Sequence, residues 1–335
     1  MKAVVCEQFG DPEQVLQVRT DQPLPEPGKG QVRVRMIASP VNPSDLMTVR
    51  GVYGRRPEFP FTPGYEGVGV VEAGSGLLAR RVMGKRVAVL NGGGNRGNWA
   101  EHVIIPARQA VPVWKTLSDE QAATFFVNPA TALIMTRYVL RVPRGAWLLQ
   151  TAAGSALGRM VIRLGQFYGF RTLNVVRRRE QIDEMRRLGG TAVIATADGT
   201  ITEQVAKATN NEPVRHALDC VGGPTTADVA RALGRDGRLL VFGTLGDDPM
   251  TLDTRVLMSG QKRIEGFWLS EWVKDQGVLT MLLLFRKLNK LIASGVLATE
   301  IGPTYPLDGV RDAVREATKV ARQGKVLLRI GAPKS

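Results

Sequence analysis

Small residues occupy the key positions of the stretch TAAGSALG, residues 151–158. A full dinucleotide-binding fingerprint reads G-x-G-x-x-G, and its three glycine positions hold Ala153, Ser155 and Gly158 here. A predicted strand precedes this turn and a predicted amphipathic helix follows it, so N–H groups at the helix start could hold a pyrophosphate. The Ser155 hydroxyl could add a donor. The alternative is a tight turn between a strand and a helix that binds no ligand.

Three consecutive arginines, Arg177, Arg178 and Arg179, follow the next predicted strand, residues 172–176. In a dinucleotide-binding unit this strand usually ends, about 20 residues past the glycines, in an acidic residue that accepts the ribose hydroxyls of NAD. A guanidinium binds a 2′-phosphate through two hydrogen bonds, whereas a carboxylate repels it. The run therefore predicts selection of NADPH, with Arg177 and Arg179 as the preferred contacts. A solvated basic loop is the alternative for at least one of the three.

The elements around these residues alternate between strand and helix. The pattern predicts strands at 146–152, 172–176, 192–196, 216–222 and 238–243, and helices at 155–170, 180–189, 202–209 and 226–235. Such alternation is typical of a parallel sheet with right-handed crossovers. In the first helix one face is apolar and is expected to be buried: Leu157, Met160, Val161, Leu164, Phe167 and Tyr168.

The first 120 residues have a different rhythm. Short strand-like runs are separated by turns rich in proline and glycine, which indicates an antiparallel barrel-like or sandwich-like domain. After about residue 264 a long helical stretch and a final strand, residues 325–330, should return the chain to this first domain. The expected domains are 1–122, 123–264 and 265–335, the last completing the first.

The chain has 335 residues, a net charge of +14 and a pI of about 10.2. Such an excess attracts polyanions. The basic residues are scattered and no standard nucleic-acid module is visible, so nucleic acid is not expected as a partner. An anionic cofactor, an anionic substrate or an acidic carrier protein fits the charge equally well, and an arginine-rich proteome would also explain it.

Features of membrane and secreted proteins are missing from the sequence. No run of about 18 uncharged apolar residues occurs, so no membrane span is expected. The first residues, MKAVVCEQFG, read as a strand rather than a signal peptide. Cys6 and Cys220 do not form a disulfide framework. These observations predict a cytoplasmic protein.

Two stretches of the first domain, VNPSD (41–45) and PGYEGVG (63–69), together with the alternating unit, resemble the medium-chain dehydrogenase/reductase superfamily. The resemblance covers essentially the whole chain. It implies an α/β fold: a GroES-like, β-rich catalytic domain plus a Rossmann dinucleotide-binding domain with a doubly wound parallel sheet. It also implies a homodimer built by pairing the Rossmann sheet edges.

The zinc-dependent members of that superfamily place a cysteine where Asn42 stands and a histidine where Tyr65 stands. The chain has only two histidines, His102 and His216, and no cysteine cluster. The usual nitrogen and sulfur ligands of zinc cannot therefore be assembled, and we expect a zinc-free enzyme.

Within the superfamily, residues 42–60 and GFWLSEW (266–272) are similar to segments of the mitochondrial-type trans-2-enoyl thioester reductases, and NVVRRRE (174–180) resembles a third. In that family the tyrosine of the first segment donates a proton, which implies this role for Tyr53. A phenol is protonated at neutral pH and can donate to a developing enolate. The alternative for Tyr53 is an aromatic residue that lines the pocket, and quinone oxidoreductases of the superfamily also often have a tyrosine there.

The resemblance implies further site residues. Trp268 joins Tyr53 in the expected catalytic set, although a core aromatic is the competing interpretation. The expected cofactor contacts are Asn128, Gly154, Ser155, Ala156, Leu157, Arg177, Arg178, Arg179, Phe242, Gly243, Thr244, Leu245, Phe267, Trp268, Leu269 and Lys325. The turn departs from the family pattern, because Gly154 stands where asparagine is common and Ala156 replaces a glycine.

The leading hypothesis is NADPH-dependent reduction of the C=C bond of a trans-2-enoyl thioester, carried by coenzyme A or an acyl carrier protein. Hydride would add to Cβ and a proton to Cα, with Tyr53 as the donor. The alternative enzyme is an NADPH:quinone oxidoreductase or a reductase of small α,β-unsaturated carbonyls. A third hypothesis, a non-catalytic protein that senses NADPH or binds nucleic acid, is disfavoured by the segment around Tyr53.

Overall fold

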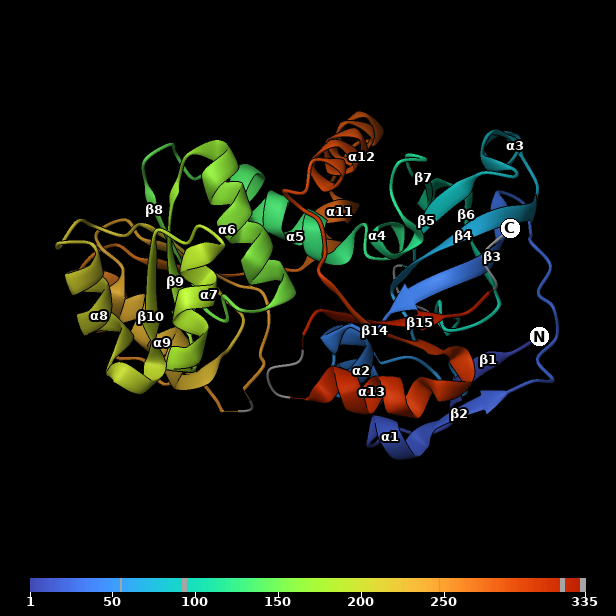
Figure 1. Cartoon of the computed structure of the whole chain (residues 1–335), viewed down its shortest axis with the longest axis horizontal. Coiled ribbons are helices and arrows are strands. Elements are labelled where there is room, and N and C mark those ends of the chain that lie inside the picture. Colours follow the sequence, from blue (N-terminus) through green and yellow to red (C-terminus); the bar gives the residue numbers. More distant parts are fainter. Residues whose placement is uncertain (55, 92–94, 247, 320–322, 332–335) are drawn as a thin grey trace. The chain divides into compact units, whose positions relative to one another are not determined.

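The computed structural model describes residues 1–54, 56–91, 95–246, 248–319 and 323–331. It divides into two compact units, and Figure 1 labels many of their elements. Unit 1 contains Met1–Val127 and Leu282–Ser335, and unit 2 contains Asn128–Met281. The units therefore change at 127/128 and 281/282, whereas the sequence predicts domain boundaries at 122/123 and 264/265.

Hydrogen bonding explains the first difference and part of the second. The N–H groups of Phe126 and Val127 donate to the Glu66 carboxylate in unit 1 at 3.0 and 2.8 Å, which holds the segment after residue 122 in that unit. Strand β13 (Arg263–Gly266) pairs with strand β12 (Arg238–Val241) and so extends the sheet of unit 2.

Unit 1 is mainly a seven-stranded sheet. Its order is β14-β15-β3-β4-β5-β7, and β6 also pairs with β3. The strands of unit 1 are β1 (Ala3–Cys6), β2 (Leu16–Arg19), β3 (Gln31–Pro40), β4 (Glu66–Gly74), β5 (Arg86–Leu90), β6 (His102–Pro106), β7 (Ala110–Pro112), β14 (Ile301–Pro306) and β15 (Lys325–Arg329). The last strand pairs with β3, with Leu327 opposite Pro40, so the chain returns to its first sheet as the sequence suggests.

Short helices border this sheet. They are α1 (Pro12–Val15), α2 (Pro43–Val49), α3 (Leu77–Val82), η1 (Ala107–Gln109), α4 (Asp119–Ala123), η5 (Leu307–Gly309) and α13 (Val310–Thr318), while α5 (Val127–Ile134) and α12 (Val278–Ala293) cross the unit boundaries. The amphipathic helix α13 buries Val310, Ala313, Val314 and Ala317 in a cluster that also contains Leu328 of β15. This packing ties the returning segment to the first 127 residues.

The end of helix α2 sets the position of Tyr53. Gly51 adopts φ +76°, and a Cβ there would lie 2.8 Å from Cγ of Phe9, so the turn requires glycine. The N–H groups of Val52 and Tyr53 then both donate to the carbonyl oxygen of Met47, at 3.1 and 3.3 Å. The Tyr53 backbone is therefore anchored on α2.

Unit 2 is a six-stranded sheet with the order β10-β9-β8-β11-β12-β13, and every neighbouring pair is parallel. The remaining strands are β8 (Trp147–Gln150), β9 (Arg171–Val176), β10 (Ala192–Ala195) and β11 (His216–Asp219). The helices are η2 (Met135–Val139), α6 (Ala156–Tyr168), η3 (Arg179–Gln181), α7 (Ile182–Arg187), η4 (Thr196–Asp198), α8 (Ile201–Ala208), α9 (Gly223–Ala232), α10 (Arg255–Met258) and α11 (Leu269–Lys274).

Both faces of this parallel sheet are covered. Val175 packs in one apolar cluster and its neighbour Val176 in another, as the two-residue period of a strand requires. The first cluster includes Ile201 and Val205 of α8, and the second includes Met185 of α7. Helices on opposite faces of a parallel sheet confirm the predicted α/β class and the doubly wound sheet.

Helix α6 follows the prediction closely, with one exception. It begins after Ser155 and ends at Gly169, which adopts φ +77°. Leu157, Met160, Val161 and Leu164 are buried as expected. The prediction for Phe167 is wrong: this side chain is 53% exposed and stacks edge-on against Tyr168, with 4.9 Å between the ring centroids, rather than packing in the core.

No helix in the described part of the chain combines the length and the apolar character needed to cross a membrane.

Candidate active site

Most of the expected cofactor residues follow the ends of strands in unit 2. Residues 154–157 follow β8, residues 177–179 follow β9, residues 242–245 follow β12 and residues 267–269 follow β13. Because these strands are parallel, their carboxyl ends meet at one edge of the sheet. Ligands of open α/β sheets bind outside this edge. The structure thus gathers four of the predicted segments where a dinucleotide would bind.

The turn after β8 has the features of an anion site. The Ser155 hydroxyl caps α6 by accepting the N–H of Gly158 at 3.1 Å. The N–H groups of Ala156 and Leu157 lie in the first turn of α6, where the helix itself supplies no acceptor. A Cβ at Gly158 would lie 2.5 Å from the carbonyl oxygen of Ala153, so this glycine lets the helix approach the turn. The turn therefore fits a pyrophosphate.

A buried carboxylate that the sequence analysis missed holds the start of this turn. Asp219 is 0% exposed. One of its oxygens accepts the Thr151 hydroxyl at 2.6 Å, and the other accepts the Thr226 hydroxyl at 2.6 Å and the N–H of Gly222 at 3.1 Å. Asp219 thus joins the ends of β8 and β11 to helix α9. A carboxylate at the end of an apolar strand, three residues before a pair of glycines, is the signal that could have identified it.

The arginine run is partly engaged within unit 2. Arg179 forms an ion pair with Asp198 of η4. Arg177 is exposed, and its carbonyl oxygen accepts the Thr196 hydroxyl at 3.5 Å. Arg178 precedes η3 and is half-buried. Of the two arginines preferred from the sequence, Arg179 already has a carboxylate partner, so a 2′-phosphate would have to compete with Asp198 for it.

Trp268 lies two residues after the end of β13 and directly precedes α11. Its side chain is 41% exposed, so it is not a core aromatic of unit 2. Trp272, one turn later, stacks edge-on against Tyr138 with 5.8 Å between the ring centroids. Asn128 is the second residue of α5, at the point where the two units change.

Lys325 belongs to a buried group of polar side chains in unit 1. This polar cluster consists of Asn42, Asp45, Glu66 and Lys325, all at most 2% exposed. Lys325 Nζ donates to Asn42 Oδ1 at 2.7 Å, and Asn42 Nδ2 donates to Glu66 Oε1 at 3.0 Å. Asp45 accepts the N–H of Asn42 at 2.8 Å and the N–H of Tyr65 at 3.1 Å. The sequence analysis assigned Lys325 to the cofactor and did not consider the two carboxylates.

Burial controls the protonation of these carboxyl groups. Loss of water raises the pKa of Asp45 to about 7, and the negative charge of Glu66 adds to the increase. The N–H of Asn42 and the positive charge of Lys325 act in the opposite direction. Burial also raises the pKa of Glu66, against the effect of the Val127 N–H that it accepts. One lysine therefore faces two buried carboxyl groups, and the neutral form of Asp45 is accessible at physiological pH.

The polar cluster does not fit a catalytic zinc ion. Asn42 and Tyr65 stand at the positions of two zinc ligands, and the amide oxygen of Asn42 already accepts the Lys325 ammonium. A cation there would be repelled by that ammonium. Among the residues that the structure describes, no group of three or more histidine, cysteine, aspartate or glutamate side chains could hold a metal ion.

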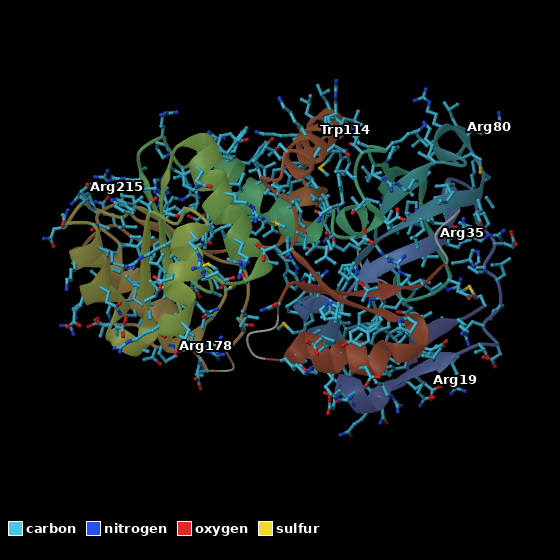
Figure 2. The ribbon with its side chains drawn as sticks, in the orientation of Figure 1. Arg19, Arg35, Arg80, Trp114, Arg178 and Arg215 are labelled. Atoms are coloured by element: carbon cyan, nitrogen blue, oxygen red, sulfur yellow. The ribbon has the colours of Figure 1, made fainter. Side chains whose placement is uncertain are left out.

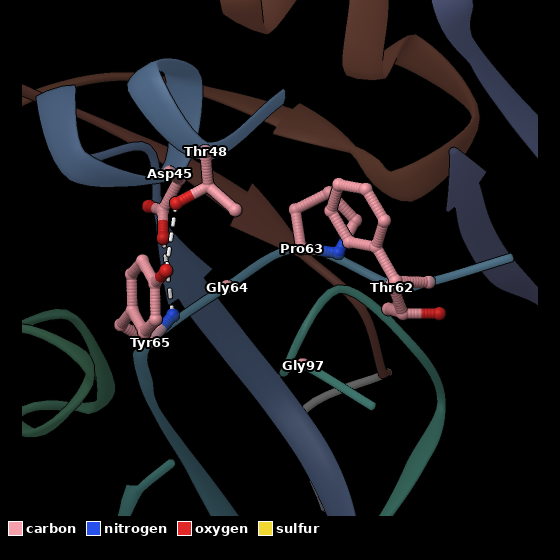
Figure 3. A pocket seen from close by; sticks show the side chains of 8 residues that line it. Asp45, Thr48, Thr62, Pro63, Gly64, Tyr65 and Gly97 are labelled. Atoms are coloured by element: carbon pink, nitrogen blue, oxygen red, sulfur yellow. Dashed lines mark hydrogen bonds between the residues drawn. The ribbon is translucent and has the colours of Figure 1, made fainter. Parts of the chain in front are cut away.

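A small cavity of about 20 Å³ opens beside the polar cluster (Figure 3). Its lining residues are Asp45, Thr48, Phe61, Thr62, Pro63, Gly64, Tyr65 and Gly97. Thr48 and Tyr65 join their hydroxyl groups across 2.6 Å. The ring of Tyr53 lies against that of Tyr65, with 5.7 Å between the centroids. Two phenols and a buried carboxyl group therefore meet at this part of unit 1.

Arginine side chains occur in both units. Figure 2 labels Arg19, Arg35 and Arg80 in unit 1 and Arg178 and Arg215 in unit 2. Arg19 pairs with a glutamate at 2.8 Å and Arg35 with another at 2.5 Å. The net charge alone therefore does not mark a binding surface.

Two family models match the chain. The alcohol dehydrogenase GroES-like domain matches residues 28–115, and the zinc-binding dehydrogenase model matches residues 156–283. These matches confirm the GroES-like and Rossmann-type assignments. The second model is named for zinc, whereas the two ligand positions in this chain hold asparagine and tyrosine.

Individual proteins resemble the chain over almost its full length. The human mitochondrial enoyl-[acyl-carrier-protein] reductase is 31% identical over 333 residues, which cover 98% of this chain and 88% of that protein. A Bacillus thuringiensis structure named as an NADPH:quinone reductase is 33% identical with a TM-score of 0.90, covering 98% of each chain. The mitochondrial 2-enoyl thioester reductase Etr1p/Etr2p heterodimer of Candida tropicalis is 25% identical with a TM-score of 0.81, covering 98% of this chain and 99% of that one.

These similarities run through both units and agree with the family that the segments around Tyr53 and Trp268 resemble. The chain belongs to the mitochondrial-type enoyl-[acyl-carrier-protein] reductase family of the medium-chain dehydrogenase/reductase superfamily.

Proposed function

We propose that this protein uses NADPH to reduce the C=C bond of trans-2-enoyl thioesters carried by coenzyme A or an acyl carrier protein. The observation that carries the proposal is the 31% identity to an enoyl-[acyl-carrier-protein] reductase over 98% of the chain. Tyr53 of unit 1 is the candidate for the proton donor that such a reaction needs.

Unit 2 supplies the cofactor site. When bound, NADPH provides the hydride that adds to Cβ of the substrate. The N–H groups of Ala156 and Leu157 would hold the pyrophosphate at the start of α6. Arg177 and Arg179 would hold the 2′-phosphate, which distinguishes NADPH from NADH. The residues after β12 and β13 lie at the same edge and would flank the nicotinamide.

Unit 1 supplies the proton. Tyr53 would donate its phenolic proton to Cα: its O–H bond breaks, a C–H bond forms, and the enolate electrons become the C–H pair. The resulting phenolate then takes a proton from solvent. A phenol has a reference pKa near 10, so the acid form is present at neutral pH. Because Asn42 and Tyr65 replace zinc ligands and Lys325 already occupies the Asn42 amide oxygen, no metal takes part in this scheme.

Quinone reduction is the second candidate activity. The 33% identity to a structure named as an NADPH:quinone reductase favours it. The same cofactor site would serve, and no carbon atom would need a dedicated acid. The GFWLSEW segment favours the enoyl thioester over the quinone.

The test is an NADPH oxidation assay with crotonyl-CoA, a longer enoyl-CoA and a quinone side by side, before and after treatment with a chelator. We expect the enoyl-CoA substrates to be reduced and the chelator to have no effect. Turnover of the quinone alone would establish the second candidate. Loss of activity after chelation, restored by zinc, would show that the polar cluster has been misinterpreted.

We also propose that the protein is a cytoplasmic homodimer. Strand β13 is the last strand of the unit 2 sheet and has exposed residues at both ends, Arg263 and Gly266, so a second copy could pair with it. Light scattering should give twice the chain mass of 36.5 kDa. A single-chain mass at micromolar concentration would contradict this assembly.

A further inference from the structure

Tyr65 is held more firmly than a residue that merely lines a pocket. It precedes β4, and its peptide is bonded on both sides. Its N–H donates to Asp45 Oδ1 at 3.1 Å, and its carbonyl oxygen accepts the N–H of Asn91 at 3.0 Å. The first of these partners belongs to helix α2, the same helix that anchors Tyr53.

The direction of the Tyr65 hydrogen bond follows from its partner. Thr48 lies in α2, and its hydroxyl donates to the carbonyl oxygen of Ser44 at 2.8 Å. A threonine hydroxyl has a single proton. In the 2.6 Å hydrogen bond between Thr48 and Tyr65 the phenol must therefore be the donor. The Tyr65 proton is directed at Thr48, and the phenol is fixed at both its backbone and its hydroxyl (Figure 3).

The fixed ring is in contact with the proposed proton donor. The centroids of Tyr53 and Tyr65 are 5.7 Å apart and their planes are inclined by 46°. This separation is within the range of favourable aromatic pairs. The backbone of Tyr53 is held by the bond from its N–H to Met47. Contact with the Tyr65 ring therefore limits the orientations that the Tyr53 side chain can adopt.

We propose that Tyr65 is a positioning residue for Tyr53: locked to helix α2 by its hydrogen bond to Thr48, its ring holds the Tyr53 hydroxyl in the direction from which a proton reaches Cα. This inference rests on the proposed enoyl thioester reduction. Tyr65 does not itself donate to the substrate, because its proton is engaged by Thr48. A small displacement of an acid from its productive position lowers the rate of proton transfer.

The test removes the hydrogen bond between Tyr65 and Thr48 by changing either partner. Tyr65→Phe keeps the ring and removes the hydroxyl, and Thr48→Val removes the acceptor with a side chain of similar shape. With crotonyl-CoA we expect each variant to lower kcat about tenfold, which corresponds to the free energy of about one hydrogen bond. The KM for NADPH should be unchanged. Thr48→Ser restores the hydroxyl and should recover most of the rate that Thr48→Val loses. Tyr305→Phe, which removes a phenol from β14, is the matched control and should leave kcat unchanged.

A double variant distinguishes a positioning role of Tyr65 from other roles. In Tyr53→Phe, the further change Tyr65→Phe should have no additional effect, because no Tyr53 hydroxyl remains to be aimed. An undiminished kcat in Tyr65→Phe overturns the inference. An equal loss from Tyr65→Phe in both backgrounds also overturns it, since Tyr65 would then act independently of Tyr53. Thermal melting of each variant identifies a loss that is due to unfolding.

The outcomes also separate this inference from the proposed function. If the wild type does not reduce crotonyl-CoA or a longer enoyl-CoA, the proposed function fails and the inference fails with it. If the wild type is active and Tyr53→Phe is strongly impaired, while Tyr65→Phe and Thr48→Val are normal, only the positioning role is wrong.

Discussion

The two units hold their functional groups in different ways. In unit 2 the expected cofactor residues lie in short segments directly after strands, and the parallel order of the strands brings these segments to one edge. These segments carry the backbone N–H groups at the start of α6 and the guanidinium groups of the arginine run. In unit 1 the polar cluster combines side chains from α2, β4 and β15, and its key bond joins Lys325 to Asn42, which are 283 residues apart in the chain.

This difference teaches where each kind of change should act. We expect a change in the unit 2 segments to alter the binding of the cofactor and to leave the core intact. A change in the polar cluster of unit 1 leaves a buried charge without its partner, so it acts on folding. Tyr53 stands between these cases, because its backbone depends on α2 for its position and its proposed role is to donate a proton to the substrate.

The largest effect is expected for Tyr53→Phe. Removal of a general acid typically costs about 10²–10⁴-fold in rate, and we expect a fall of this order in kcat with an enoyl-CoA. NADPH affinity and melting temperature should be nearly unchanged, since the ring remains. Stopped-flow and steady-state assays measure the rate, and quinone turnover by the same variant is the control. If this variant has the kcat of the wild type, Tyr53 only lines the pocket and does not donate a proton.

Next in size is the effect of Lys325→Met on stability. The change leaves Asp45 and Glu66 buried without their cation, and removal of one member of a buried charge group costs about 3–5 kcal/mol of unfolding free energy. Urea denaturation of the cofactor-free protein measures it. Lys319→Met, which removes a lysine from an exposed pair with Glu316, is the control and should have little effect.

The pH dependence of the Lys325→Met loss sharpens this prediction. A carboxyl group whose pKa is raised by folding adds stability at low pH, and this contribution is lost as pH rises through the folded pKa. Removing the lysine raises the pKa of Asp45 further. The deficit should therefore be larger at about pH 8 than at about pH 5. If the loss of unfolding free energy is the same at the two pH values, Lys325 stabilises the protein by packing alone.

A smaller effect is expected when the arginine run of unit 2 is changed. Arg177→Ala with Arg179→Ala should weaken NADPH binding relative to NADH binding by about 1.5–3 kcal/mol for each charge-assisted hydrogen bond to the 2′-phosphate that is removed. Fluorescence titration with both cofactors measures the ratio. The melting temperature should remain close to that of the wild type, in contrast to Lys325→Met. If the binding of NADPH and NADH were weakened equally, these arginines would not be contacts of the 2′-phosphate.

The smallest effect is expected for Asp198, a residue that the sequence did not point to and that pairs with Arg179 in the structure. Asp198→Asn frees Arg179 from its ion pair, so NADPH affinity should rise about two- to fivefold, as expected for an exposed ion pair. NADH affinity should not change. Asp183→Asn makes the same charge change on α7, where Asp183 pairs with Arg186 instead, and is the matched control. A gain in both variants would reflect net charge rather than competition for Arg179.

Local patterns predicted the elements of unit 2 well. The strand-helix alternation, the small residues of the turn at 151–158 and the burial of Leu157, Met160 and Val161 were all readable, because each depends on neighbours within one or two turns of chain. Phe167 was misassigned by the same reasoning. It continues the apolar face of α6 in the sequence, yet it stacks on Tyr168 at the exposed end of the helix.

The sequence by itself determined the class of fold through its periodicity. Its short motifs, and the family that they resemble, predicted the cofactor edge and the candidate acid Tyr53. Only the tertiary structure decided that Lys325 bonds to Asn42, that Arg179 pairs with Asp198 and that Tyr65 lies against Tyr53. The physical reason is that a buried polar group needs a partner, while its own segment does not specify which distant segment provides that partner.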